Sequence, residues 1–181
     1  MKKSAFTMIE LIIVIVVAGI LAAVMIPRLE RDNLREAANQ VVQHIQYTQH
    51  LAMMNDVYDD GNTNWYQNRW SINLCSTAYA VERANGSEVA EDTLTQRAIN
   101  GTDNDLADMG ITGISVAPAA GNCRLAFDNL GRPYSFTDVP VFVSPADSLI
   151  TADTVITLTA DGRTATINIT KETGFVKLNP L

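Results

Sequence analysis

The chain has 181 residues, enough for one ordinary domain with an additional element but too few for two large domains. Apolar residues make up 47% of it, and most of the surplus lies in one segment, residues 6–26. The formal net charge is −7, from 13 basic and 20 acidic residues. Because an acidic surface repels phosphate groups at long range, nucleic acid is not the expected partner of the polar part of the chain.

The apolar segment, Phe6 to Ile26, has 21 residues and a single charge. As a helix it would be about 30 Å long, the thickness of the hydrocarbon core of a membrane. A short basic start, residues 1–5, precedes it, and no small-residue cleavage site separates it from the polar sequence after it. We therefore expect the segment to span a membrane and to be retained after any processing.

Glu10 is the one charged residue of this segment. A carboxylate at the centre of a membrane costs about 2.5 to 3.5 kcal/mol on insertion scales, and less near an end. No basic residue within the segment can pair with it. We therefore expect a partner from outside the span, and a free α-amino group of a neighbouring subunit would serve.

The sequence Lys3-Ser4-Ala5 followed by Phe6-Thr7-Met8-Ile9-Glu10-Leu11 closely resembles the class III signal of type IV pilins and type II secretion pseudopilins. The resemblance implies that prepilin peptidase cleaves between Ala5 and Phe6 and that Phe6 is N-methylated. It also implies that Glu10 pairs with the methylated terminus of an adjacent subunit. The family usually has Gly before the cut, where this chain has Ala5.

The same resemblance implies a domain organisation and a location. Residues 1–5 would be the leader peptide, 6–27 the transmembrane and assembly helix, and 28–181 a globular pilin-like domain that includes a second helical half, 28–55. The precursor would cross the inner membrane once with its head in the periplasm. It would then join a pilus or pseudopilus at the cell surface or in the periplasm, with other pilin or pseudopilin subunits as partners.

Beyond the apolar segment the helix continues. Pro27 predicts a kink or local melting, because proline removes a helical hydrogen bond; the alternative is a plain helix stop. Apolar and small residues then recur at intervals of three or four and predict a buried stripe: Leu34, Ala38, Val41, Ile45, Thr48 and Ala52. The histidines His44 and His50 are six residues apart, and we expect both on the polar face.

The remainder predicts a β-rich head, so that the expected fold is α+β, a long N-terminal helix packed on a small antiparallel head. Strands are expected at 70–74, 123–127 and 139–143, separated by an irregular polar region, 82–110, with one short helix. The clearest signal is a hairpin, with strands at 155–159 and 164–170 around the turn residues Asp161-Gly162. A last strand is expected at 175–178.

Cys75 and Cys123 are 48 positions apart in the part of the chain expected outside the cytoplasm. An oxidising compartment favours a disulfide, which would stabilise the head by about 4 kcal/mol on the loop-entropy estimate. The alternative is a pair of buried thiols.

Known catalytic motifs are missing from the sequence, and we expect neither an enzyme nor a cofactor. Asp103, Asp105 and Asp108 partly resemble a calcium loop but lack its full spacing, so solvated loop charge is the favoured interpretation. Trp65, Tyr66 and Trp70 form either an exposed recognition patch or, as aromatics beside a strand more often do, part of the core.

The function predicted from the resemblance is that of a structural filament subunit, a pilin, minor pilin or pseudopilin. A diffuse likeness to the minor H-type pseudopilins, which sit at or near the filament tip, favours a minor subunit. That likeness rests on Leu34 to Asn39, Ala126-Phe127-Asp128, Gly131-Arg132-Pro133, Thr166 to Ile169 and Thr173-Gly174. The alternative is a tip adhesin or DNA-uptake binding module carried on such a filament.

Overall fold

The computed structural model describes residues 7–93, 95–102, 105–118, 123–136 and 149–180, with only the backbone described at 24–32. The chain divides into two compact units, Met1–Asn33 and Leu34–Leu181. Helix α1 (Met8–Met54) contributes to both. Its helical assignment is continuous through Pro27, so the chain does not stop being helical there, and the kink stays a prediction.

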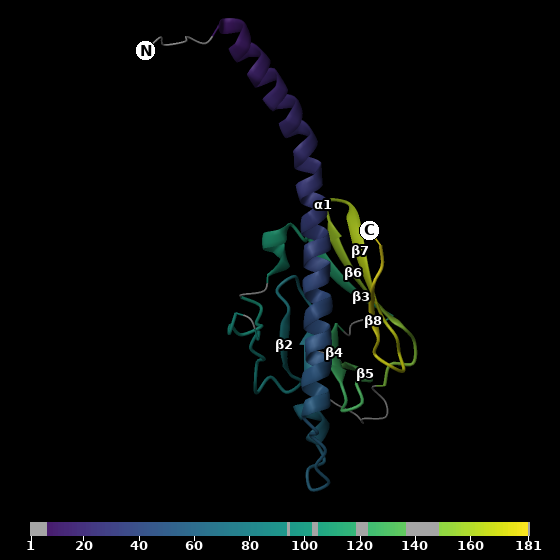
Figure 1. The fold of residues 1–181 in the computed structure, drawn as a ribbon. Coiled ribbons are helices and arrows are strands. Elements are labelled where there is room, and N and C mark those ends of the chain that lie inside the picture. The colour runs from purple at the N-terminus through teal and green to yellow at the C-terminus, as the bar shows by residue number, and fades with distance from the viewer. Residues whose placement is uncertain (1–6, 94, 103–104, 119–122, 137–148, 181) are drawn as a thin grey trace. The chain divides into compact units, whose positions relative to one another are not determined.

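The second unit combines the C-terminal part of α1 with two four-stranded antiparallel sheets (Figure 1). One sheet has the order β2-β1-β4-β5 and the other β3-β6-β7-β8. The elements are η1 (Trp65–Asn68), β1 (Trp70–Asn73), β2 (Ala80–Arg83), η2 (Leu106–Met109), β3 (Gly113–Ala117), β4 (Arg124–Phe127), β5 (Pro133–Phe136), β6 (Thr154–Ala160), β7 (Arg163–Ile169) and β8 (Val176–Leu178). The predicted α+β fold with an antiparallel head is confirmed.

The predicted stripe of α1 packs into a single core with residues of both sheets. Every member of the stripe is at most 3% exposed, from Leu34 to Ala52. The facing strands contribute Ile72 and Leu125 from one sheet and Ile156 and Ile167 from the other, each fully buried: all four are 0% exposed. Burying one such aliphatic side chain contributes about 1.5 to 3 kcal/mol, so this core is what holds the helix on the sheets.

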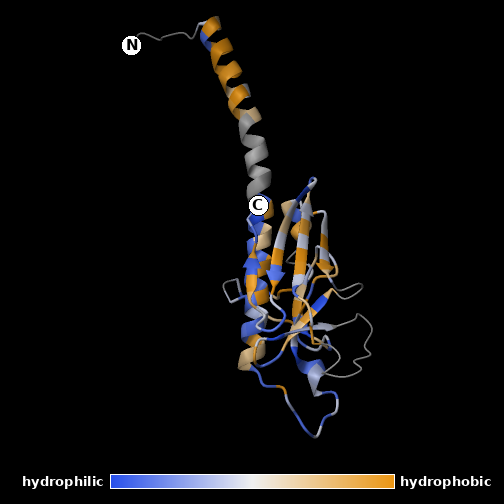
Figure 2. Cartoon of the chain, turned by 90° about the vertical axis from the view of Figure 1, so that its right-hand side faces the viewer, coloured by the Kyte–Doolittle hydropathy of each residue, from blue (hydrophilic) through white to orange (hydrophobic). Residues whose placement is uncertain are grey.

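The predicted hairpin is present as β6 and β7. Residues alternate between buried and half-buried along β6 and from Ala165 to Ile169 of β7, which is the period of a sheet with one face in the core (Figure 2). Asp161 and Gly162 connect the strands with positive φ angles of 46° and 75°. Two successive positive φ angles are typical of the type I′ turn, whose twist matches that of the strands it joins.

Gln49 connects the helix to a turn of each sheet. Its Nε2 donates to the carbonyl of Gly174, between β7 and β8, at 2.6 Å, and to that of Gly131, between β4 and β5, at 3.4 Å. Gly174 has a positive φ of 66°, and a side chain there would clash with the Gly131 carbonyl. Gln49 is accordingly half-buried.

The disulfide Cys75–Cys123 is present. The two cysteines flank the paired strands β1 and β4, and their Cα atoms are 4.9 Å apart. Leu74 N donates to Cys123 O at 2.9 Å, which continues the ladder up to the bridge. The strand expected at 139–143 lies outside the described residues.

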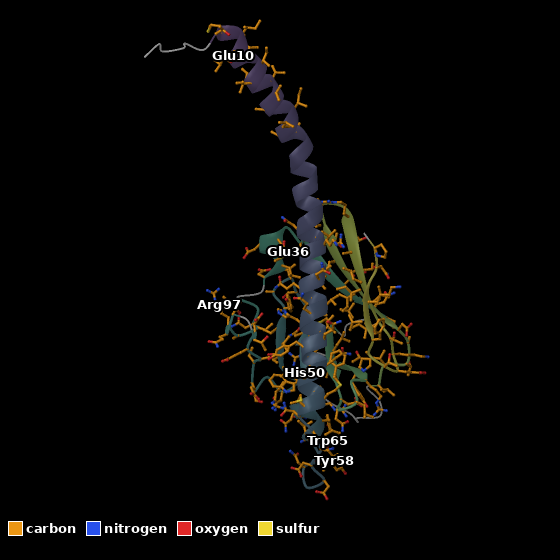
Figure 3. All side chains as sticks on the ribbon, in the orientation of Figure 1. Glu10, Glu36, His50, Tyr58, Trp65 and Arg97 are labelled. Atoms are coloured by element: carbon orange, nitrogen blue, oxygen red, sulfur yellow. A yellow bond between two sulfur atoms is a disulfide. The ribbon has the colours of Figure 1, made fainter. Side chains whose placement is uncertain are left out.

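The prediction that both histidines lie on the polar face is wrong for His44. His50 is exposed (Figure 3). His44 is only 8% exposed and contacts Tyr79. His44 follows Val41 by three residues and precedes Thr48 by four, so it lies at the edge of the buried stripe. The buried face of the helix is therefore wider than the predicted stripe. The spacing between the two histidines did not indicate which of them is buried.

Candidate assembly site in the N-terminal helix

Helix α1 begins with a cap that its own sequence supplies. The amide of Glu10 donates to Thr7 Oγ1 at 3.4 Å, and the amide of Leu11 donates to Thr7 O at 3.3 Å. A threonine side chain that accepts from the third helical residue satisfies one of the free amides of a helix start. Thr7 and Glu10 have the spacing of a capping box, and a carboxylate in the first turn also complements the helix dipole.

The following residues are apolar around the whole circumference of the helix. All residues from 7 to 23 are exposed, and the large apolar side chains among them are 50–82% exposed (Figures 2 and 3). These side chains are Met8, Ile9, Leu11, Ile12, Ile13, Val14, Ile15, Val16, Val17, Ile20 and Leu21. A helix that is apolar all round needs a nonpolar surrounding on every side, unlike the amphipathic continuation of α1 after Leu34.

Within the described residues, no helix is both long enough and apolar enough to cross a membrane.

Glu10 lies within this apolar surface, close to the start of the helix (Figure 3). In the described part of the chain its carboxylate has neither a hydrogen bond nor an ion pair; only its backbone amide is engaged, by Thr7. Ala5 and Phe6 lie outside the described residues. Leader cleavage, N-methylation of Phe6 and the pairing of Glu10 therefore stay predictions.

The weak calcium candidates do not form a described site. Asp105 accepts a hydrogen bond from Ala107 N at 2.9 Å and so caps η2, and Asp108 is exposed in the same turn. Asp103 lies outside the described residues. Across the described ranges, no group of three or more His, Cys, Asp or Glu side chains is placed to hold a metal ion.

Two polar features of the head were not predicted from the sequence. The first is a buried cluster in which Tyr79 Oη contacts Gln40 Nε2 at 3.0 Å and His44 Nδ1 at 2.5 Å, with Asp92 at 3.7 Å from His44 Nε2. Burial is the main cause that lowers the pKa of His44 below its ordinary value, against the opposing effect of Asp92. Burial likewise raises the pKa of Tyr79.

The second feature is an aromatic and arginine cluster beyond the C-terminal end of α1. Of the three aromatic residues singled out from the sequence, Tyr66 and Trp70 are buried, at 7% and 4% exposed, and Trp65 is half-buried. Arg69 is stacked on Trp65 and lies only 6% exposed. A buried arginine next to a strand gives no periodic signal, so sequence patterns alone did not indicate it.

Comparison with known proteins assigns the N-terminal segment. Residues 1–26 match the family described as the prokaryotic N-terminal methylation motif, which is the class III prepilin signal of type IV pilins and pseudopilins. The resemblance drawn from residues 3–11 is thereby confirmed, whereas the narrower likeness to minor H-type pseudopilins stays a prediction. Neither a curated protein nor a solved structure matches the chain.

Proposed function

We propose that the chain is the precursor of a structural subunit of a type IV pilus-like or type II secretion filament. Prepilin peptidase cleaves it between Ala5 and Phe6 and methylates Phe6, and the mature protein assembles through its N-terminal helix. The observation that supports this most is the prepilin signal at residues 1–26, continued by a helix whose apolar side chains are exposed on all sides.

Before assembly, this helix lies in the inner membrane and the head is in the periplasm. The exposed side chains of residues 8–21 lose their contact with water in the bilayer and afterwards against the helices of other subunits. In this proposal residues 1–5 are the leader, 6–27 the membrane and assembly helix, and 28–181 the exported domain. The disulfide between Cys75 and Cys123 fits an exported head.

Glu10 gives the assembly its register. A carboxylate in an apolar environment is costly, and the cost is offset when a positive group approaches it with good geometry. The methylated amino group of Phe6 on a neighbouring subunit has the required charge. Because only one axial offset between two helices brings these groups together, the pair selects that offset over others.

The mature N-terminus tests this function. Filaments or membranes from cells that express the full chain together with prepilin peptidase should contain a protein that begins at Phe6 and carries a methyl group there. Mass spectrometry of the N-terminal peptide measures both features. Assembled protein that still begins at Met1 would contradict the proposal, and Ala5→Gly, which restores the usual residue before the cut, is the matched control for processing efficiency.

One observation in the head favours a second function, ligand binding by a subunit carried on the filament. Arg69 and Trp70 each hold a buried nitrogen atom that has no hydrogen-bond partner within the described residues.

A further inference from the structure

A pocket of about 360 Å³ lies at the C-terminal end of α1, bounded by the following loop, by η1 and β1, and by the turn between β4 and β5. We call it the helix-end pocket. Its volume lies at the lower end of the range of ligand pockets, about 300 to 1,000 Å³, and is large enough for an amino-acid side chain or a chain terminus. Four lining residues carry the argument: Tyr58, Trp65, Arg69 and Trp70.

Arg69 is a buried cation that forms no ion pair within the described residues, although Tyr134 and Asp128 act to raise its pKa against the larger effect of burial. Its guanidinium is stacked between two rings, 4.9 Å from the centroid of Trp65 and 4.1 Å from that of Tyr134. Its Nη1 atom has no hydrogen-bond acceptor, and the ion pairs found in the described ranges do not include it. Burial accordingly lowers the pKa of Arg69. The two rings hold the guanidinium in place, and its Nη1 atom remains a hydrogen-bond donor without an acceptor.

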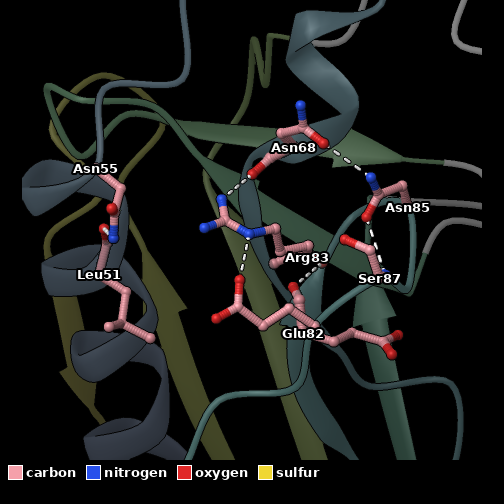
Figure 4. A network of polar contacts seen from close by, with 9 residues as sticks. Leu51, Asn55, Asn68, Glu82, Arg83, Asn85 and Ser87 are labelled. Atoms are coloured by element: carbon pink, nitrogen blue, oxygen red, sulfur yellow. Dashed lines mark hydrogen bonds and ion pairs between the residues drawn. The ribbon is translucent and has the colours of Figure 1, made fainter.

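Trp70 provides a second unused donor in the same wall. Its side chain is buried and its Nε1 has no acceptor. Arg83 lies over its ring at 4.6 Å and is itself held by Glu88 and by the carbonyl of Asn68, both at 2.7 Å (Figure 4). Arg83, the last residue of β2, therefore holds the indole ring of Trp70 in place, and this fixes the direction of the Nε1–H bond.

Asp128, the nearest carboxylate of the pocket wall, is fully engaged elsewhere. Oδ1 accepts from the amides of Leu130 and Arg132, at 3.0 and 2.8 Å. Oδ2 accepts from Arg132 Nε at 2.7 Å and from Tyr134 Oη at 3.3 Å. Asp128 thus has no capacity left for Arg69, and within the described residues Arg69 Nη1 and Trp70 Nε1 remain without an acceptor.

We propose that the helix-end pocket binds a carboxylate group carried on a peptide. Arginine and the indole N–H are both donors only, so their common ligand is an acceptor, and the planar guanidinium fits the two oxygens of a carboxylate. Asp56 and Asp128 also line the pocket and oppose a doubly charged phosphate more strongly than a singly charged carboxylate. The carboxylate belongs either to an acidic side chain or to a chain terminus.

A peptide fits the pocket better than an acidic sugar. Sugar rings bind by stacking on a free aromatic face, but Trp65 already has Arg69 over its ring and contacts the rings of Tyr58 and Tyr66 edge to face, at 5.2 and 6.1 Å. Asn129, which also lines the pocket, has an amide that can donate to and accept from a peptide backbone.

The loop of residues 56–64 forms part of the pocket wall through residues 56–58, and the nitrogen atoms of the two donors are closed off from solvent. Its hydrogen bonds run within the loop or to the adjacent η1, such as Tyr58 N to Asp56 Oδ1 and Trp65 N to Asn62 O, both at 3.1 Å. Tyr58 is 64% exposed and contacts Trp65 (Figure 3). The loop can therefore move away from the pocket without breaking a hydrogen bond to either sheet.

Titration of the full-length protein in mild detergent tests the proposal. The probes are acetyl-Gly-Glu-Gly-amide, with a side-chain carboxylate, and acetyl-Gly-Gly-Gly, with a terminal carboxylate; their controls are the corresponding Gln peptide and the C-terminal amide. Both tryptophans of the chain line the pocket, so a saturable change in tryptophan fluorescence reports binding there. At least one acidic peptide should bind ten times or more tightly than its uncharged control, and the better of the two identifies the source of the carboxylate.

Variants connect the binding to the two donors. Arg69→Lys keeps the positive charge but loses the planar guanidinium that can donate to two oxygens at once. Trp70→Phe keeps an aromatic ring but loses the indole N–H. Each variant should bind the peptide at least tenfold more weakly, as measured by calorimetry. Trp70→Phe also removes buried ring atoms, so a cooperative thermal unfolding transition well above the temperature of the binding assay is needed to show that this variant is folded. Arg97→Lys, at an exposed arginine outside the pocket, is the matched control and should bind normally.

Several results would overturn the proposal. Equal binding of acidic and uncharged peptides would exclude carboxylate recognition, and so would inorganic phosphate binding as tightly as the peptides. Glucuronic acid that binds when neither peptide does would assign the pocket to glycans. Loss of binding in Arg97→Lys equal to that in Arg69→Lys would show that the effect is not specific to the helix-end pocket. None of these results bears on the mature N-terminus, so the filament function is tested separately.

Discussion

His44 is held in a defined protonation state by its neighbours. Gln40 Nε2 donates to Tyr79 Oη, which leaves the hydroxyl proton of Tyr79 available for donation to a neutral His44 Nδ1. The neutral imidazole then carries its own proton on Nε2, which faces the Asp92 carboxylate at 3.7 Å. Protonation at Nδ1 would place two donors against one buried hydroxyl, which agrees with the lowered pKa of His44.

This lowered pKa predicts a loss of stability in acid. Between the folded pKa and the unfolded value of about 6.5, the unfolded chain binds more protons than the folded one, so the free energy of unfolding falls as the pH falls. Below the folded pKa the penalty is constant. We expect His44→Gln to remove the part of this pH dependence that His44 causes. Urea unfolding at pH values from 7.5 to 4.5 measures the free energy of unfolding of both proteins.

The exposed His50 is the matched control, and His50→Gln should keep the acid-dependent loss seen in the unaltered protein. If His44→Gln and the unaltered protein lose stability in parallel as the pH falls, the buried cluster does not contribute the pH dependence.

At the scale of elements, the sequence predicted the segments that have a regular period. The stripe of α1 and the alternation of β6 and β7 each place residues on one face, and both were found as expected. Although β1 and β4, which have four residues each, were predicted, the short strands β2, β3 and β5 were not. They are defined by their pairing, such as Ile72↔Val81 and Val116↔Ile156, and pairing between distant segments has no local signal.

Candidate sites, like strands, were predicted only where neighbouring residues gave a local signal. Glu10 was identified because one charge in an apolar run stands out locally, and the prepilin signal around it is confirmed. The helix-end pocket was not identified, because it joins Arg69 and Trp70 to the end of a helix and a turn near Asp128. Only the fold brings these segments together, and only the structure shows that Asp128 is already engaged.

In the N-terminal part of helix α1, Glu10→Val should impair assembly into filaments. Valine fits the apolar surroundings, so the variant should insert into the membrane and fold its head normally, while its incorporation into filaments should fall at least tenfold. Immunoblots of sheared filament and membrane fractions measure the ratio. Glu36→Val removes an equal charge from an exposed position of α1 in the head and should assemble normally (Figure 3). Undiminished incorporation of Glu10→Val would refute the register pair.

For the head as a whole, the disulfide closes a loop that joins distant parts of the chain. Strands β1 and β4 are neighbours in one sheet, yet the cysteines that flank them are 48 residues apart. A bridge across a loop of this length restricts the unfolded chain and stabilises the fold by about 2 to 4 kcal/mol. The segment between the cysteines contains β2, β3 and η2, so the bridge limits the freedom of elements from both sheets.

We therefore expect Cys75→Ser with Cys123→Ser to keep the fold but to lower the free energy of unfolding by about 2 to 4 kcal/mol. The fold survives because Ile72 and Leu125 remain in the core between the paired strands. Urea unfolding followed by tryptophan fluorescence reports this transition, since Trp65 and Trp70 lie in the head. A reductant should bring the unaltered protein to the stability of the double variant and leave the variant unchanged. A loss below about 1 kcal/mol would mean that the unfolded chain already keeps these strands close together, so that the bridge adds little to what local contacts impose.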